Sequence, residues 1–145
     1  PTIRIETNSL DGAKKPVLKR RPEIIFGLRN FIENAAGYAE NDVLISAEWG
    51  ENRLSVSVHD DGPGFSPEIL ARLGEPYVSA RAGYRLPGSK SGLGLGFFIA
   101  KTLLEATGAR VVFENRHWEG SPHGLSGAWV GAEWDLKATN ASLIA

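Results

Sequence analysis

The chain of 145 residues contains no cysteine. This excludes disulfides, thiolate metal sites and a cysteine nucleophile, and it is compatible with a reducing compartment. Long apolar runs are absent too: none approaches the roughly 20 residues of a membrane-spanning helix, and the first residues lack the apolar centre of a signal peptide. We therefore expect a soluble domain that makes no direct membrane contact.

An excess of charge of either sign is also lacking. Sixteen Lys and Arg face 17 Asp and Glu, for a formal net charge of −1, and no block of like charge stands out. This balance does not support binding to nucleic acid or to an anionic membrane, so we expect no nucleic-acid partner.

What the chain does have is a hydrophobic content of 42%. Over this length, that content is typical of one globular domain, so a single domain is expected over residues 1–145. Because the sequence begins with Pro1 rather than Met, we expect it to be a piece of a longer polypeptide.

Periodicity in the sequence predicts an α+β domain. Alternating residues predict strands at 2–6, 43–49, 53–60, 110–115 and 127–136. Helices are predicted from Pro22, over 66–73 with Ser66 as N-cap, and over 93–106 with Gly108 after its end. The half-polar strands favour a two-layer sandwich: a mixed, mostly antiparallel sheet of about five strands with about three helices on one face.

The first predicted helix has a polar side. Its apolar residues form a stripe about 120° wide, while Asn30 and Asn34, in "NFIENA", lie about 40° apart on the opposite side. Taken alone, such a pair more often marks a solvated helix face.

A second motif, "DDGPGF", follows the predicted strand 53–60. It places an acidic residue at the strand end and then a Gly-x-Gly turn that a flat ligand can approach closely. Taken alone, it also fits an ordinary turn.

A third motif is the glycine run "GLGLG", with Gly92, Gly94 and Gly96 at alternate positions. It matches neither a dinucleotide-binding G-x-G-x-x-G nor a P-loop, and no strand precedes it. The glycines could serve only close helix packing. Alternatively, the N–H groups and the positive dipole end of the helix start could receive a phosphate.

In this order, the three motifs resemble the N, G1 and G2 boxes of the ATP-binding domain shared by bacterial sensor histidine kinases, DNA gyrase, Hsp90 and MutL. The resemblance covers about residues 22–114 and implies the Bergerat-type fold, with ATP and Mg²⁺ as ligands. The run "GFFIAKTLLEATGA" is similar to sensor kinases of the redox-responsive RegB/PrrB type.

The resemblance also implies roles for individual residues. Asn34 would hold Mg²⁺ through its side-chain oxygen, and Asn30 would support the phosphates or the water shell of the metal. Asp60 would accept a hydrogen bond from the adenine amino group. The other nucleotide-binding residues that it implies are Tyr38, Gly62, Gly64, Tyr77, Gly92, Gly94, Leu95 and Gly96. Cations for the phosphates would come from a lid loop over 77–91, with Arg85 first and Arg81 and Lys90 as alternatives.

The resemblance separates two kinds of chemistry. The gyrase, Hsp90 and MutL branch carries a Glu at the position of Asn30, whereas the carboxylate in this chain is Glu33. We therefore expect phosphoryl transfer to a histidine, with Asn30 and Glu33 as catalytic candidates, rather than efficient hydrolysis. A hydrolytic ATPase and a nucleotide sensor without chemistry remain alternatives. The sensor alternative is supported by Gly37, because these kinases often have Lys or Arg at this position.

The implied partners lie outside the chain. His59, His117 and His123 do not lie in a pattern like the acceptor helix of the family, and we expect His59 at a strand end and the other two in a loop. A separate dimerisation domain would carry the acceptor histidine, and a response regulator would receive the phosphoryl group. The parent protein would be a homodimer in the bacterial inner membrane, with this domain in the cytoplasm.

Overall fold

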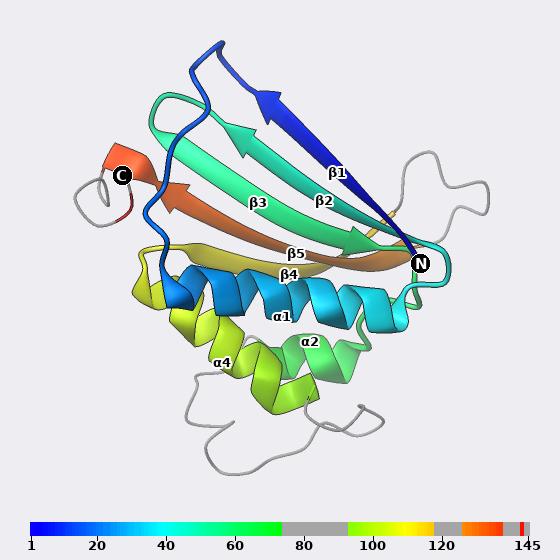
Figure 1. The fold of residues 1–145 in the computed structure, drawn as a ribbon. Helices are drawn as coiled ribbons and strands as arrows, with labels where there is room; N and C mark the ends of the chain where they lie inside the picture. The colour runs from blue at the N-terminus through cyan, green and yellow to red at the C-terminus, as the bar shows by residue number, and fades with distance from the viewer. Residues whose placement is uncertain (74–92, 118–125, 138–142, 144–145) are drawn as a thin grey trace.

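The computed structural model describes residues 1–73, 93–117, 126–137 and 143. Within these residues, three helices lie on one face of a five-stranded sheet (Figure 1). In chain order the elements are β1 (Thr2–Ser9), α1 (Pro22–Tyr38), β2 (Asp42–Trp49), β3 (Arg53–Asp60), α2 (Pro67–Leu73), α4 (Leu93–Ala106), β4 (Arg110–His117) and β5 (Ser126–Asp135).

The sheet is mixed, in the strand order β1-β2-β3-β5-β4. The first strand runs parallel to β2, and the other three pairs are antiparallel. The predicted two-layer α+β sandwich is therefore confirmed. The helices of the described residues are too short or too polar to cross a lipid bilayer.

Two strands extend at least two residues beyond the predicted ends, and β2 begins one residue early, at Asp42. β1 continues to Ser9 because it pairs with β2 in unbroken register, from Thr2 against Asp42 to Ser9 against Trp49. β4 continues to His117, which pairs with Ser126. His117 is thus in a strand and not in the predicted loop. In both strands, pairing with a neighbour overrides a polar local sequence.

Helix boundaries follow the predicted signals. Pro22 is the first residue of α1. The Ser66 hydroxyl accepts a hydrogen bond from the Ile69 N–H at 3.2 Å and so caps α2. After α4, Gly108 has a φ of 96°, the left-handed conformation that ends many helices.

The core lies between the sheet and the helix pair α1 and α4. Phe31 of α1 and Leu104 of α4 are almost completely buried, as is Trp134 of β5. A Cβ added to Gly27 would lie 2.5 Å from Cγ of Leu104, so the two helices touch at this glycine. Burying a large apolar side chain contributes about 1.5–3 kcal/mol, so these contacts fix α1 firmly on the sheet.

Candidate functional site

A cavity of about 290 Å³ opens between α1, the start of α2, and strands β3 and β5. Its volume is near the lower end of the range typical of small-molecule sites. The polar lining comes from Asn34, Tyr38, Asp60 and Ser66. The other lining residues are Phe31, Ala35, Val58, Pro63, Gly64, Phe65, Ile69, Phe97, Ala128 and Val130.

The floor of the cavity is aromatic. Phe31 of α1 stacks on Phe97 of α4 with ring centroids 5.4 Å apart, and Phe65 meets Phe97 edge to face at 6.0 Å. Phe113 of β4 packs edge-on against Phe31 at 5.8 Å. Rings held in these geometries are rigid and apolar, so the floor of the cavity is suited to a flat ring of a ligand and excludes water.

The two asparagines of α1 contact each other. Nδ2 of Asn34 donates to the backbone oxygen of Asn30 at 2.9 Å and to its Oδ1 at 3.1 Å. Both side chains are half-buried, although the sequence placed them opposite the apolar stripe. The buried face is rotated toward Gly27 because α4 packs there, and Ile25 at the other edge of the stripe is left 43% exposed.

Asp60 ends β3 inside the cavity and is only 4% exposed. Burial raises the pKa of this carboxyl above its ordinary value of 3.8, and the neighbouring Asp61 charge adds to the rise. The Gly62 N–H, which donates to Oδ1 of Asp60 at 2.8 Å, acts in the opposite direction. The hydrogen bond thus fixes the orientation of the carboxylate, but it offsets only part of the cost of burying the negative charge.

The glycines of "DDGPGF" are required by the backbone. A Cβ on Gly62 would collide with the Tyr38 carbonyl at the end of α1, so this position has room only for glycine. Gly64 has a φ of 79°, which other residues rarely adopt. The turn therefore brings its backbone up to the end of α1, where the cavity lies.

The glycine run meets α1 at the predicted place. α4 begins at Leu93, so Gly94 and Leu95 lie in its first turn, and Gly96 follows. A Cβ on Gly96 would lie 3.1 Å from Nδ2 of Asn30. The third motif therefore contacts the first through Asn30, one helical turn from the cavity residue Asn34.

Several predicted site residues cannot be placed. Tyr77, Arg81, Arg85, Lys90 and Gly92 lie outside the described residues, as does His123. Their assignments remain predictions.

Glu33 lies at the exposed surface of α1, whereas Asn34 lines the cavity. Its side chain is 63% exposed and forms an ion pair with Arg29, one turn earlier, at 2.9 Å. It does not appear among the residues that line the cavity. Its catalytic role stays a prediction, and its place on the helix does not favour activation of a water at the nucleotide.

A protein-only metal centre is not formed by the part of the chain that the structure describes, which holds no suitable group of three His, Cys, Asp or Glu side chains. His59 lies in β3, as expected, and its Nε2 is 3.1 Å from the Arg116 backbone oxygen. Burial lowers the pKa of His59. The half-buried imidazole of His59 therefore makes a structural contact and belongs to no group of metal-ligand side chains among the described residues.

Sequence reasoning missed one part of the site, the aromatic floor. Phe31, Phe65 and Phe97 come from separate parts of the chain, and no local pattern in the sequence connects them. Of the two adjacent carboxylates in "DDGPGF", Asp60 lines the cavity and Asp61 does not.

Comparison with known proteins places the chain among ATPase domains. Residues 21–134 match the model of the family described as Histidine kinase-, DNA gyrase B-, and HSP90-like ATPase. Sensor histidine kinase RegB of Cereibacter sphaeroides is 47% identical over 106 residues, which cover 70% of this chain and 23% of RegB. Sensor protein kinase CarS of Pseudomonas aeruginosa is 30% identical over 115 residues, which cover 79% of this chain and 24% of CarS. The chain thus spans about a quarter of the length of these relatives.

Solved structures share the fold. The catalytic domain of histidine kinase ThkA superposes with a TM-score of 0.64 at 23% identity, covering 92% of this chain and 78% of that one. Mycobacterial sensor histidine kinase MprB gives a TM-score of 0.60 at 16% identity, covering 91% and 82%. Together with the family match, these similarities confirm the resemblance inferred from the three motifs.

Proposed function

Because the chain belongs to the family of histidine kinase-, DNA gyrase B- and HSP90-like ATPases, we propose that it binds Mg-ATP and transfers the γ-phosphoryl group to a histidine of a separate dimerisation domain. One observation carries this proposal: Asn34, Asp60 and Gly64, from two distant motifs, line one cavity, and Gly96 of the third motif contacts Asn30 beside it.

Asp60 selects the base. Its carboxylate lines a cavity with an aromatic floor, where it accepts a hydrogen bond from an exocyclic amino group. Adenine carries such a group, whereas guanine presents a carbonyl oxygen at the same place. The Gly62 N–H holds the carboxylate in this orientation, so little ordering is needed when the base enters.

Asn34 is suited to hold a magnesium ion that would also be bound by the nucleotide. Its amide nitrogen is occupied by Asn30, so Oδ1 lies on the other edge of the amide as a hard oxygen donor. A single neutral oxygen suits an ion whose other ligands are phosphate oxygens and water. When bound, Mg²⁺ supplies neutralisation of charge on the phosphates.

The other contribution of these residues to phosphoryl transfer is to position the nucleotide. The cavity fixes the base, α1 presents Asn34 toward the phosphates, and the first turn of α4 offers backbone N–H groups near Asn30. Glu33 is engaged by Arg29 at the helix surface. This arrangement favours transfer to an imidazole, which needs no base to take a proton from it, over hydrolysis.

The wider setting is part of the proposal. RegB and CarS are named sensor kinases, and this chain spans about a quarter of each. We infer a homodimeric parent protein in the bacterial inner membrane, with this domain in the cytoplasm and a response regulator as the final acceptor.

Phosphoryl transfer tests the proposal directly. The domain is mixed with a separately produced acceptor-helix domain of a RegB-type kinase and ATP labelled in the γ-phosphate. We expect label on the acceptor histidine, and its loss when the domain carries Asp60→Ala. ATP binding without any labelling would favour the nucleotide sensor. Steady Mg-dependent ATP turnover by the isolated domain, abolished by Glu33→Gln, would favour the hydrolytic ATPase.

A further inference from the structure

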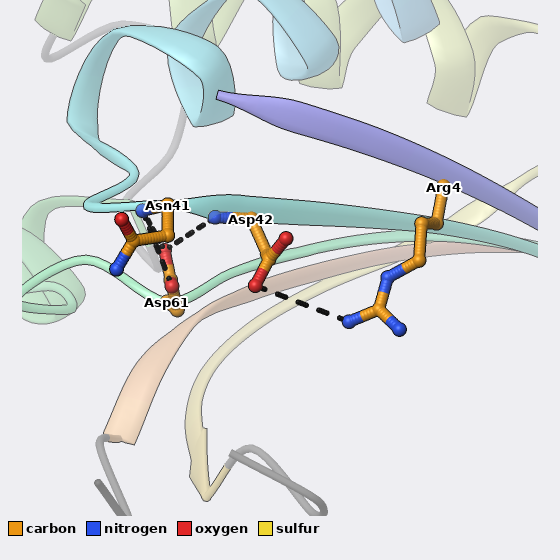
Figure 2. Close-up of polar contacts among 4 residues, drawn as sticks. All are labelled: Arg4, Asn41, Asp42 and Asp61. Carbon is orange, nitrogen blue, oxygen red and sulfur yellow. Dashed lines mark hydrogen bonds and ion pairs between the residues drawn. The ribbon is translucent and has the colours of Figure 1, made fainter. Parts of the chain in front are cut away.

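A second carboxylate, Asp61, lies next to the adenine-binding Asp60 but points away from the cavity. Its Oδ1 accepts hydrogen bonds from the backbone N–H groups of Asn41 and Asp42, both at 3.0 Å, and its Oδ2 lies 3.2 Å from the Asn41 N–H (Figure 2). The side chain is only 5% exposed. Each carboxylate of "DDGPGF" therefore has a separate task.

The groups bound by Asp61 belong to the junction between α1 and β2. The junction begins directly after Tyr38, whose side chain lines the cavity and whose carbonyl abuts Gly62. The Asp61 N–H also donates to the Asp42 carbonyl at 3.2 Å. Asp61 thus ties the end of β3 to the residues that lead from α1 into β2, by its side chain and its backbone together.

These two ends are the two walls of the site. α1 carries Asn34 and Tyr38, and β3 carries Asp60. The other side of Asp60 is fixed as well, because Gly127 of β5 packs on its carbonyl so closely that no Cβ would fit. Toward α1, Gly62 abuts the Tyr38 carbonyl and Asp61 binds the start of β2, next to the sheet pairing of Asp60 with Val43.

We propose that Asp61 is a positioning residue for adenine recognition: by binding the backbone of Asn41 and Asp42, it sets the position of the Asp60 carboxylate relative to α1. This inference rests on the proposed function. It assigns the second carboxylate a part in base selectivity, although Asp61 itself does not touch the nucleotide.

The positioning role of Asp61 needs its acceptor oxygen rather than its charge. The two shortest hydrogen bonds end on Oδ1, so the amide oxygen of an asparagine can accept both. Alanine removes the acceptor and leaves the N–H groups of Asn41 and Asp42 without it. The pair of variants therefore separates the hydrogen bonds from the negative charge.

The experiment compares Asp61→Ala, Asp61→Asn and the wild type in calorimetric titrations with Mg-ATP and Mg-GTP, alongside their thermal unfolding. We expect Asp61→Ala to lower the ratio of ATP to GTP affinity about tenfold, the size of one lost hydrogen bond to a charged group. Asp61→Asn is expected to keep the ratio within about threefold of the wild type.

Asp42→Asn provides the matched control. The Asp42 side chain forms a partly exposed ion pair with Arg4 at 4.0 Å (Figure 2). The substitution leaves the backbone N–H of this residue in place to bind Asp61. Because such an exposed pair contributes little, the ratio should stay unchanged.

Three outcomes are informative. A melting temperature that falls in Asp61→Ala while the affinity ratio stays at the wild-type value would overturn the inference, because Asp61 would then be structural only. Asp61→Asn behaving like Asp61→Ala would overturn it too. A wild-type domain that does not prefer ATP over GTP would instead contradict the proposed function itself.

Discussion

The side-chain amide of Asn34 donates to Oδ1 of Asn30 across one turn of α1, at 3.1 Å. This contact fixes which end of the Asn34 amide is left for a ligand. The nitrogen is occupied by Asn30, and the oxygen remains to coordinate a metal ion. It also joins the helix motif to the glycine run, because Asn30 is the residue that Gly96 approaches.

Asn34→Asp is expected to weaken Mg-ATP binding. An aspartate has no N–H to donate, so it sets a carboxylate oxygen against Oδ1 of Asn30 where a hydrogen bond stood. We expect a loss of affinity of about 10-fold to 100-fold, as for other changes around metal ligands. Calorimetry with and without Mg²⁺ measures it. Glu33→Gln, at the exposed ion pair next to it, should bind Mg-ATP as the wild type does; equal affinities for all three proteins would contradict the role of Asn34.

Asp60→Asn should weaken discrimination between bases. The variant amide can turn its N–H toward the carbonyl of guanine, so ATP affinity falls while GTP affinity is kept or rises. A change of about tenfold to 100-fold in the ATP to GTP ratio corresponds to 1.4–2.8 kcal/mol. GTP serves as the internal control, since a loss shared by both nucleotides would indicate a damaged fold instead.

ATP affinity should fall in mild acid. Burial, assisted by the Asp61 charge, holds the pKa of Asp60 above 3.8, and a protonated carboxyl is a poorer acceptor for the adenine amino group. Affinity is therefore full above the raised pKa and falls as the pH drops through it. The measurement is the ATP affinity of the wild type divided by that of Asp60→Asn between pH 7 and the lowest pH at which both stay folded. A ratio independent of pH would contradict the assignment.

Asp61 should make the fold sensitive to stronger acid. Burial alone would raise the pKa of this carboxyl, but backbone hydrogen bonds, above all those from Asn41 and Asp42, together outweigh burial and lower the pKa. A carboxyl whose pKa is lower in the folded state stabilises above its unfolded pKa, about 3.8, and loses that contribution as the pH falls through the folded pKa. The free energy of unfolding of the wild type should therefore approach that of Asp61→Asn on acidification. Denaturation at neutral pH and near pH 3 tests this, and a constant difference would count against it.

Gly27→Ala should loosen α1 from α4. The added methyl would lie 2.5 Å from Cγ of Leu104, so one of the helices must shift. Overpacking of this kind costs about 1–3 kcal/mol of unfolding free energy. In a Leu104→Ala background the same change should cost much less, because the two substitutions act on one contact. Additive costs in a double-mutant cycle would show that the two residues do not meet.

The element order of the fold was predictable because each part carries a local signal. Pro22 and Ser66 mark helix starts, and alternation marks strands such as Arg53–Asp60. The extension of β1 to Ser9 was not predictable, since it depends on pairing with β2 and its own residues Thr7 and Asn8 are polar.

The site was predictable only as far as its motifs reach. The resemblance of the motifs to the family predicts Asn34, Asp60 and Gly64 as site residues, and the three do line one cavity. The half-buried setting of the asparagines was not foreseen, because it follows from the contact between Gly27 and Leu104, two residues far apart in the chain.

Backbone NMR of the domain, titrated with Mg²⁺ and a non-hydrolysable ATP analogue, tests the central claim most directly. The account predicts that the amide signals of Asn34, Gly62 and Gly64 shift together with one dissociation constant, while those of Ser55 and Ser57, on the opposite face of the sheet, stay in place. Shifts that leave the three site residues unchanged, or that gather on the serines, would contradict it.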